Sequence, residues 1–225
     1  MKTVSLVWLG LCLATSGFSA TDSKVEKLVQ LNFEMDKSHH SLVNNFSEAR
    51  DYLTVVREEV RFPSGRQHDR LDQALDLLEE IMNSDEFRRK VTTYIQPDGT
   101  ANYQKNYLWN ETDKTLSRHE VYNIIMEGWE ASRPDTAGEM NLNIKKYHSW
   151  WSRVIGWTSP SSSKWINVNW RFYKRYQVHE MVGNIVHEWV HLLGFLHGNQ
   201  KLHQEVPYVV GAIAGQIAKN RLDKK

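Results

Sequence analysis

The stretch HEWVHLLGFLHG, residues 187–198, brings together three histidines and a glutamate, with Gly194 between the second and the third histidine. On a helix, His187 and His191 lie on one face a single turn apart, and two imidazoles at that spacing can bind one zinc ion. Glu188 is rotated around the helix and reaches a water molecule activated by the metal, whose proton a carboxylate can accept. His197 completes the ligand set if the chain reverses abruptly, and Gly194 provides the left-handed backbone for that reversal. The spacing predicts a zinc site with Glu188 as general base.

The full pattern, HExxHxxGxxH, resembles the zinc-binding consensus of the metzincin metallopeptidases at residues 187–197. The resemblance implies His187, His191 and His197 as ligands and Glu188 as general base. It also implies a mixed sheet within residues 115–197, in which the strand VIGWT, 154–158, or a neighbouring strand binds an extended peptide by strand addition. One family feature is missing, because no methionine follows Met181 and the methionine turn is therefore absent.

The segment EVPYVVG, residues 205–211, offers a substitute for that turn. Pro207 can fix a turn, and Tyr208 then points its hydroxyl at the metal or at the developing oxyanion as a catalytic residue. The alternative for Tyr208 is a packing role at the start of a C-terminal helix. Glu205 and His203 are rival third ligands, but Pro207 argues against a glutamate ligand within a helix. His197 is preferred over both.

The residues of the motif follow a predicted helix and several predicted strands, and they lie on a second predicted helix. Residues 179–194 have the apolar content of a buried helix that ends at Gly194, and 115–132 form another helix candidate. Between them, 139–151 and 163–174 alternate as strands do, and 153–163 reads as a short strand and a Ser/Pro loop. Five tryptophans between 150 and 170 are assigned to a packed core under this sheet in preference to a substrate groove.

The first half of the chain is helical in character. Apolar residues at helical spacing run from 22 to about 60, RFPSGRQ at 61–67 interrupts them, and a second helical pattern covers 69–95. We therefore predict an α+β protein in which an N-terminal helical hairpin precedes a small metzincin-like zinc peptidase domain, with a mixed sheet and an active-site helix. The turn QPDGT at 96–100 separates a region at 21–98, a packing platform or propeptide, from a catalytic domain at 99–225.

The N-terminus has the order of a secretory signal peptide, with Lys2, an apolar run over 4–14 and small residues before a cleavage site near Ser19. We predict a signal peptide over residues 1–19 or 1–20 and a secreted or periplasmic protein. Cys12 is the only cysteine and lies within this segment, so the mature chain has no disulfide. Lipoprotein anchoring through Cys12 is disfavoured because Leu11 precedes it where a small residue is required.

Composition excludes several classes of protein. Hydrophobic residues make up 40% of the 225 residues, charged residues 24%, and the net charge is +1, which is typical of a globular protein without a nucleic-acid partner. After signal removal no segment is apolar enough to span a bilayer. We expect a secreted zinc-dependent metalloendopeptidase with one catalytic Zn²⁺ ion and a protein or peptide substrate. The alternatives are a non-catalytic, zinc-stabilised binding module and a metal-dependent hydrolase of cell-wall peptide amides.

Overall fold

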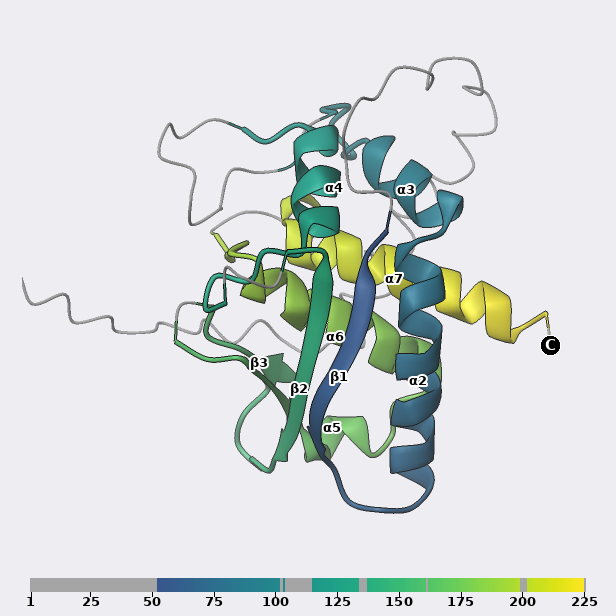
Figure 1. The fold of residues 1–225 in the computed structure, drawn as a ribbon, viewed down its shortest axis with the longest axis vertical. Coiled ribbons are helices and arrows are strands. Elements are labelled where there is room, and N and C mark those ends of the chain that lie inside the picture. The colour runs from purple at the N-terminus through teal and green to yellow at the C-terminus, as the bar shows by residue number, and fades with distance from the viewer. Residues whose placement is uncertain are drawn as a thin grey trace, which may run out of the picture.

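The computed structural model describes residues 52–101, 103, 115–133, 137–160, 162–198 and 202–224 (Figure 1). The predicted signal peptide, Cys12 and the part of the first predicted helix at 22–51 lie outside these residues. The described elements are β1 (Thr54–Arg61), α2 (Arg66–Met82), α3 (Asp85–Thr92), α4 (Arg118–Glu127), β2 (Glu139–Tyr147), β3 (Gly156–Trp157), β4 (Trp165–Asn169), α5 (Trp170–Tyr173), α6 (Val178–Leu192), a short 3₁₀ turn (Leu202–Gln204) and α7 (Val206–Leu222).

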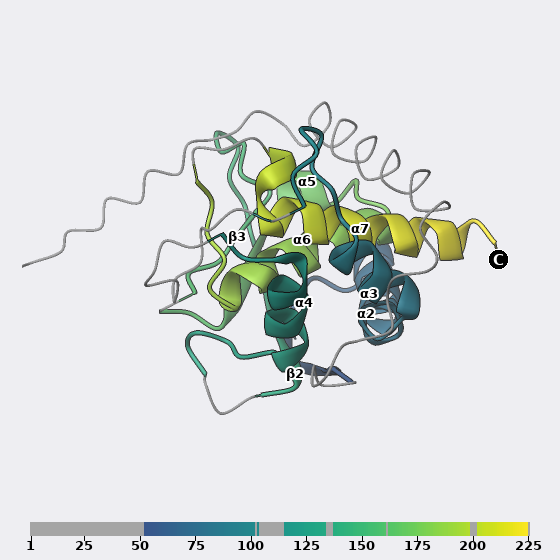
Figure 2. The same cartoon turned by 90° about the horizontal axis from the view of Figure 1, so that it is seen from above.

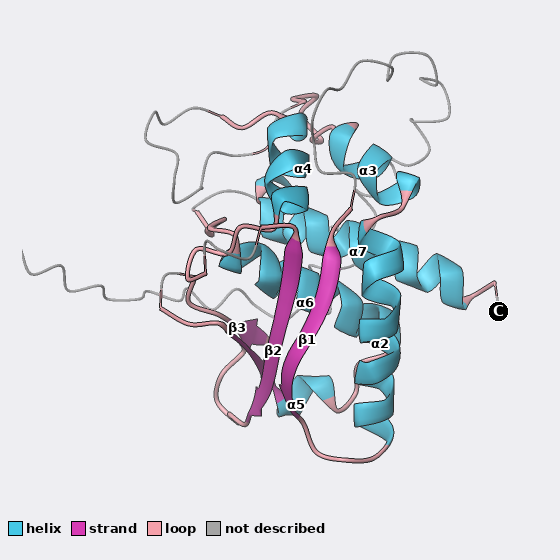
Figure 3. Ribbon diagram, viewed as in Figure 1, coloured by secondary structure: helices cyan, strands magenta, loops and turns pink. Residues whose placement is uncertain are grey.

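Four strands form one open mixed sheet in the order β1-β2-β4-β3 (Figure 3). Strands β1, β2 and β4 are parallel, with Val60 beside Ile144 and Ile144 beside Ile166. Strand β3 runs antiparallel to β4 at the edge of the sheet. The predicted mixed sheet and the helix that follows it are therefore confirmed.

The predicted N-terminal helical hairpin is wrong where its first helix overlaps the described residues. Residues 54–61 form strand β1, which pairs with β2 along its length except for a bulge between Arg57 and Glu59. The β-branched residues of TVVREEV suit a pleated strand once a partner is available, and that partner lies some eighty residues further along the chain. The second helical pattern is confirmed, but Ser84 divides it: its hydroxyl accepts a hydrogen bond from Phe87 N at 3.1 Å and caps α3.

A second difference concerns residues 163–174. The strand ends at Asn169, whose side-chain oxygen accepts a hydrogen bond from Arg171 N at 3.2 Å and starts the short helix α5. The tryptophans of this part of the chain do not all pack in the core as expected, because Trp150, Trp151 and Trp157 are 66%, 96% and 44% exposed.

Among the described helices, none combines the length and the apolar character that crossing a bilayer requires.

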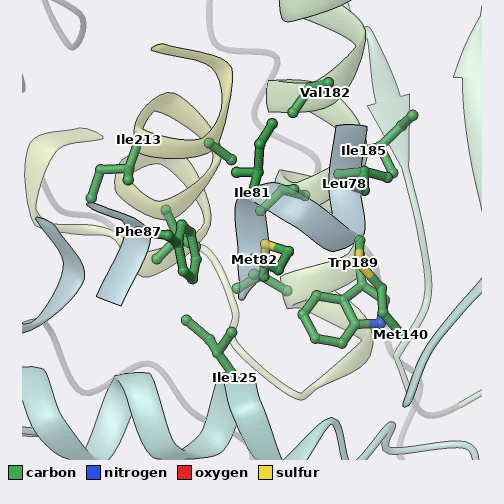
Figure 4. Close-up of a cluster of buried hydrophobic side chains, with 14 of the residues drawn as sticks. Leu78, Ile81, Met82, Phe87, Ile125, Met140, Val182, Ile185, Trp189 and Ile213 are labelled. Carbon is green, nitrogen blue, oxygen red and sulfur yellow. The ribbon is translucent and has the colours of Figure 1, made fainter. Parts of the chain in front are cut away.

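The main core lies where α2, α6 and α7 meet behind the sheet, and α6 and α7 run side by side in both views (Figures 1 and 2). Fully buried side chains from these elements, α3, α4 and β2 fill it (Figure 4). Glycines bring α6 and α7 into close contact: a Cβ atom on Gly211 would lie 2.7 Å from the Gly183 carbonyl oxygen and 3.0 Å from the Cβ of His187. This approach places the first turns of α7 directly beneath His187.

Candidate metal centre

Helix α6 carries the first two histidines of the motif. It begins at Val178, where Gln177 N donates a hydrogen bond to the Glu180 carboxylate at 2.7 Å, and ends at Leu192. Gly194 follows with a φ of 102°, as predicted from the motif. Its N–H donates to the His191 carbonyl at 2.9 Å, so the chain leaves the helix and turns back. The reversal returns His197 to the face of the helix that carries His187 and His191.

The three histidines meet at one point. One ring nitrogen from each of His187, His191 and His197 lies within 4.8 Å of the other two, and these residues form the only such cluster of potential metal ligands found among the described residues. The Nε2 atoms of His191 and His197 are 3.0 Å apart. Nitrogen ligands placed about 2.0–2.1 Å from a tetrahedral zinc ion would lie roughly 3.4 Å from one another. The triad can therefore hold a metal ion.

Each of these histidines has an oxygen atom that orients its ring. His191 Nδ1 donates to the Phe195 carbonyl at 2.6 Å, and His197 Nδ1 bonds to the Glu205 carboxylate at 2.7 Å. The backbone carbonyl of Pro207 is the partner of His187. With Nδ1 of His191 and His197 turned to these oxygens, their Nε2 atoms face each other across 3.0 Å, where one cation could contact both. Metal-binding histidines commonly have such a second partner.

The electrostatics of the site favour neutral histidines. Burial lowers the pKa of His187 well below its ordinary value, and burial together with the neighbouring His197 lowers the pKa of His191 to about 3. Both rings are thus unprotonated at neutral pH, which is the form that binds a metal. Burial raises the pKa of the Glu188 carboxyl to about 8. A cation held by the histidines would favour the charged carboxylate.

Glu188 is buried against strand β3. A Cβ atom on Gly156 of strand β3 would lie 2.5 Å from Glu188 Oε1, so only glycine leaves room for the carboxylate there. The Glu188 charge also acts on the buried Tyr173, whose pKa is raised by burial and then by this charge. The edge strand anticipated for the segment VIGWT is therefore present as β3 and lies against Glu188.

Tyr208 lies in the first turn of α7, next to the histidines. Its ring centroid is 4.6 Å from that of His187 and 4.9 Å from that of His197. The first turn of α7 thus places an aromatic ring against two of the three histidines.

The two rival ligands have other partners. Glu205 is 4% exposed and bonds to His197 Nδ1 and to Gly198 N, so it orients the third histidine. His203 is outside the cluster, and its carbonyl accepts the Tyr94 hydroxyl at 2.6 Å. Sequence reasoning considered Glu205 only as a ligand, and the place of Gly156 against Glu188 was not anticipated. A glycine within a strand was the available signal, since it often marks a close approach.

No protein-family model, curated protein or solved structure matches this chain in comparisons with known proteins. The interpretation of the site therefore depends on the chain's own residues.

Proposed function

We propose that this chain is a secreted, metzincin-like zinc metallopeptidase that hydrolyses peptide bonds. The observation that supports this proposal most directly is the convergence of His187, His191 and His197, with the buried carboxylate of Glu188 adjacent in sequence on the same helix. Catalytic zinc sites keep three protein ligands and leave one position for a water or substrate. Three histidines and a neighbouring carboxylate fit that arrangement.

The roles of the residues follow from their chemistry. His187, His191 and His197 would hold the zinc ion, which when bound lowers the pKa of a water molecule toward about 7 and polarises the substrate carbonyl. Glu188 accepts the proton of the attacking water and delivers it to the leaving amine. Tyr208, whose ring lies against His187 and His197, would donate a hydrogen bond from its hydroxyl to the negatively charged oxygen that develops on the substrate.

Strand β3 supports an extended peptide as substrate. It is one of the two edge strands of the sheet that the structure describes, and a peptide that adds to this edge would lie alongside Gly156, which packs against Glu188. Main-chain hydrogen bonds from β3 would hold the peptide in an extended conformation, and its scissile carbonyl would come close to the catalytic carboxylate.

The decisive experiment separates metal binding from hydrolysis. Glu188→Ala should keep about one zinc per chain after dialysis, as measured by elemental analysis, while hydrolysis of casein or gelatin falls by roughly 10²–10⁴-fold. His191→Ala should lose the zinc, and Glu127→Ala, which alters an exposed carboxylate at the end of α4, should change neither quantity.

Two results would contradict the proposal. If the Glu188→Ala protein cuts at the wild-type rate, Glu188 is not the general base. A wild-type protein that binds zinc but cuts neither casein, gelatin nor cell-wall peptide would point to a structural site, for which four protein ligands are usual.

A further inference from the structure

Positive charge is concentrated in one segment of this nearly neutral chain. Residues 140–179 contain seven Lys and Arg residues and no Asp or Glu, although the net charge of the whole chain is +1. The same segment contains five tryptophans. A run of forty residues without a single carboxylate creates a local positive potential that the net charge conceals.

The sheet topology gathers most of these cations at one end of the molecule. Because β2 and β4 are parallel, their carboxyl ends lie at the same end of the sheet. The loop 148–155 and helix α5 leave from that end (Figure 1). We call this region the basic end. It consists of Lys145, Lys146, Arg153, Arg171, Lys174 and Arg175.

The basic end is available to a partner. Lys146, Arg153, Lys174 and Arg175 are exposed. None of the six cations of the basic end forms an ion pair with a carboxylate in the part of the chain that the structure describes. Their charge is therefore not neutralised by that part of the fold.

Two tryptophans project from the same end. Trp150 and Trp151 are 66% and 96% exposed, in the loop that joins β2 to β3. The backbone of this loop is held in place: the Arg171 guanidinium donates to the Trp150 carbonyl, and the Val154 carbonyl accepts the Tyr147 hydroxyl at 3.0 Å. A fixed loop thus presents two large indoles to solvent beside the cations.

We infer that the basic end docks on an anionic phospholipid surface, with Trp150 and Trp151 entering the headgroup region. Indoles favour the membrane interface because one edge is polar and the rest apolar, and Lys and Arg near an anionic leaflet add to the attraction. A sugar-binding platform would need indole rings fixed by neighbouring side chains, whereas Trp151 is almost wholly exposed. The inference is independent of the metal centre.

Sedimentation of the full chain with lipid vesicles tests this docking. We expect binding to vesicles of phosphatidylcholine mixed with phosphatidylserine, no binding to phosphatidylcholine alone, and loss of binding at high salt. Lys174→Gln with Arg175→Gln should weaken binding at least roughly tenfold, since each cation contributes about a fivefold factor. The matched control is Lys219→Gln with Lys224→Gln, which removes two exposed cations at the end of α7 and should have no effect.

Tryptophan variants test whether Trp150 and Trp151 enter the headgroup region. Trp150→Ala with Trp151→Ala should weaken sedimentation and reduce the blue shift of tryptophan fluorescence on vesicle addition. Trp129→Ala removes a tryptophan that is 57% exposed near the opposite end of β2 and should change neither. Equal binding to both kinds of vesicle would overturn the inference, as would wild-type binding by both double variants or binding of soluble heparin without binding of vesicles.

Discussion

The carboxylate of Glu205 holds His197 and the turn that follows it at the same time. One oxygen bonds to His197 Nδ1 at 2.7 Å, and the other accepts the Gly198 backbone N–H at 2.9 Å. Glu205 itself immediately precedes α7, whose first turn contacts His187 through Pro207 and Tyr208. The third histidine is thus fixed by the element that packs beneath the first, and the geometry of the triad depends on the docking of α7 against α6.

Replacing this carboxylate should weaken the metal centre without removing a ligand. In Glu205→Gln the amide oxygen can accept from only one of the two donors, because the amide NH₂ would face the other N–H. We expect zinc affinity to fall roughly 10–100-fold, the range found for partners of metal-binding histidines. Competition with a chromogenic chelator measures the affinity. Glu127→Gln provides the control, and unchanged affinity in Glu205→Gln would mean that His197 needs no orienting carboxylate.

The contact between Gly156 and Glu188 gives a second prediction. In Gly156→Ala the new methyl group would lie 2.5 Å from Glu188 Oε1, so either the carboxylate or strand β3 must shift. Because a displacement of about 1 Å in a catalytic group can cost on the order of 10²-fold in rate, we expect a large loss of kcat while zinc is retained.

Gly99→Ala is the control for this experiment: its added carbon meets no atom within 4 Å, and the strain that its positive φ of 85° puts on an alanine lies in the turn at 96–100, outside the site. It should leave kcat unchanged. A Gly156→Ala enzyme with normal kcat would show that the position of the carboxylate is not critical for the reaction.

The parts of the site that were predictable from the sequence are the local ones. His187 and His191 follow from helix periodicity, and Gly194 follows from the need to end that helix with a positive φ. The role of Glu205 was not predictable in the same way. Its bond to His197 depends on a chain reversal whose path no local pattern specifies.

The fold shows the same division between local and distant information. Helices α2, α4 and α6 have continuous apolar stripes that predict them, whereas the apolar pattern over 22–60 predicts a helix where β1 forms. Val55 and Val60 fit either a helical stripe or a strand, and their neighbours in the sheet are Met140 and Ile144. The local apolar pattern does not distinguish the two, and pairing with residues so distant in sequence decides for the strand. The exposure of Trp151 was missed because composition alone assigns a tryptophan to the core.

The contribution of residues 54–92 to the sheet and core predicts the outcome of a truncation. Helix α2 alone buries five large apolar side chains almost completely: Leu71, Leu75, Leu78, Ile81 and Met82. At about 1.5–3 kcal/mol for each side chain, these five contribute roughly 8–15 kcal/mol, which is comparable to the whole stability of a typical domain. A chain that begins at residue 99 should therefore show no cooperative thermal unfolding by circular dichroism.

A chain that begins at residue 52 serves as the comparison and should unfold cooperatively, because it retains β1 and α2. Cooperative unfolding together with peptide hydrolysis by the 99–225 fragment would support the propeptide interpretation of the N-terminal region.

Glu130 gives a prediction about pH and stability. It is buried and accepts hydrogen bonds from Trp189 Nε1 and Asn141 N, both at 3.0 Å, and from Arg133 at 3.1 Å. Burial outweighs these bonds and raises the pKa of Glu130 above its ordinary value of 4.5. The folded chain therefore holds this proton more tightly than the unfolded chain does. Its contribution to the free energy of unfolding is greatest below about pH 4.5 and is lost as the pH rises through the raised pKa.

Comparison with Glu130→Gln isolates this effect, because glutamine does not titrate. We expect wild-type stability to fall relative to the variant as the pH rises from about 4 to 7, in urea unfolding with a chelator present. Glu79→Gln is a control of opposite sign, because the Tyr52 hydroxyl and Val55 N lower the pKa of Glu79. Wild-type stability should instead rise relative to Glu79→Gln as the pH increases toward 4.5. Parallel pH profiles for the wild type and Glu130→Gln would show that this carboxyl has the same pKa in the folded and unfolded chains.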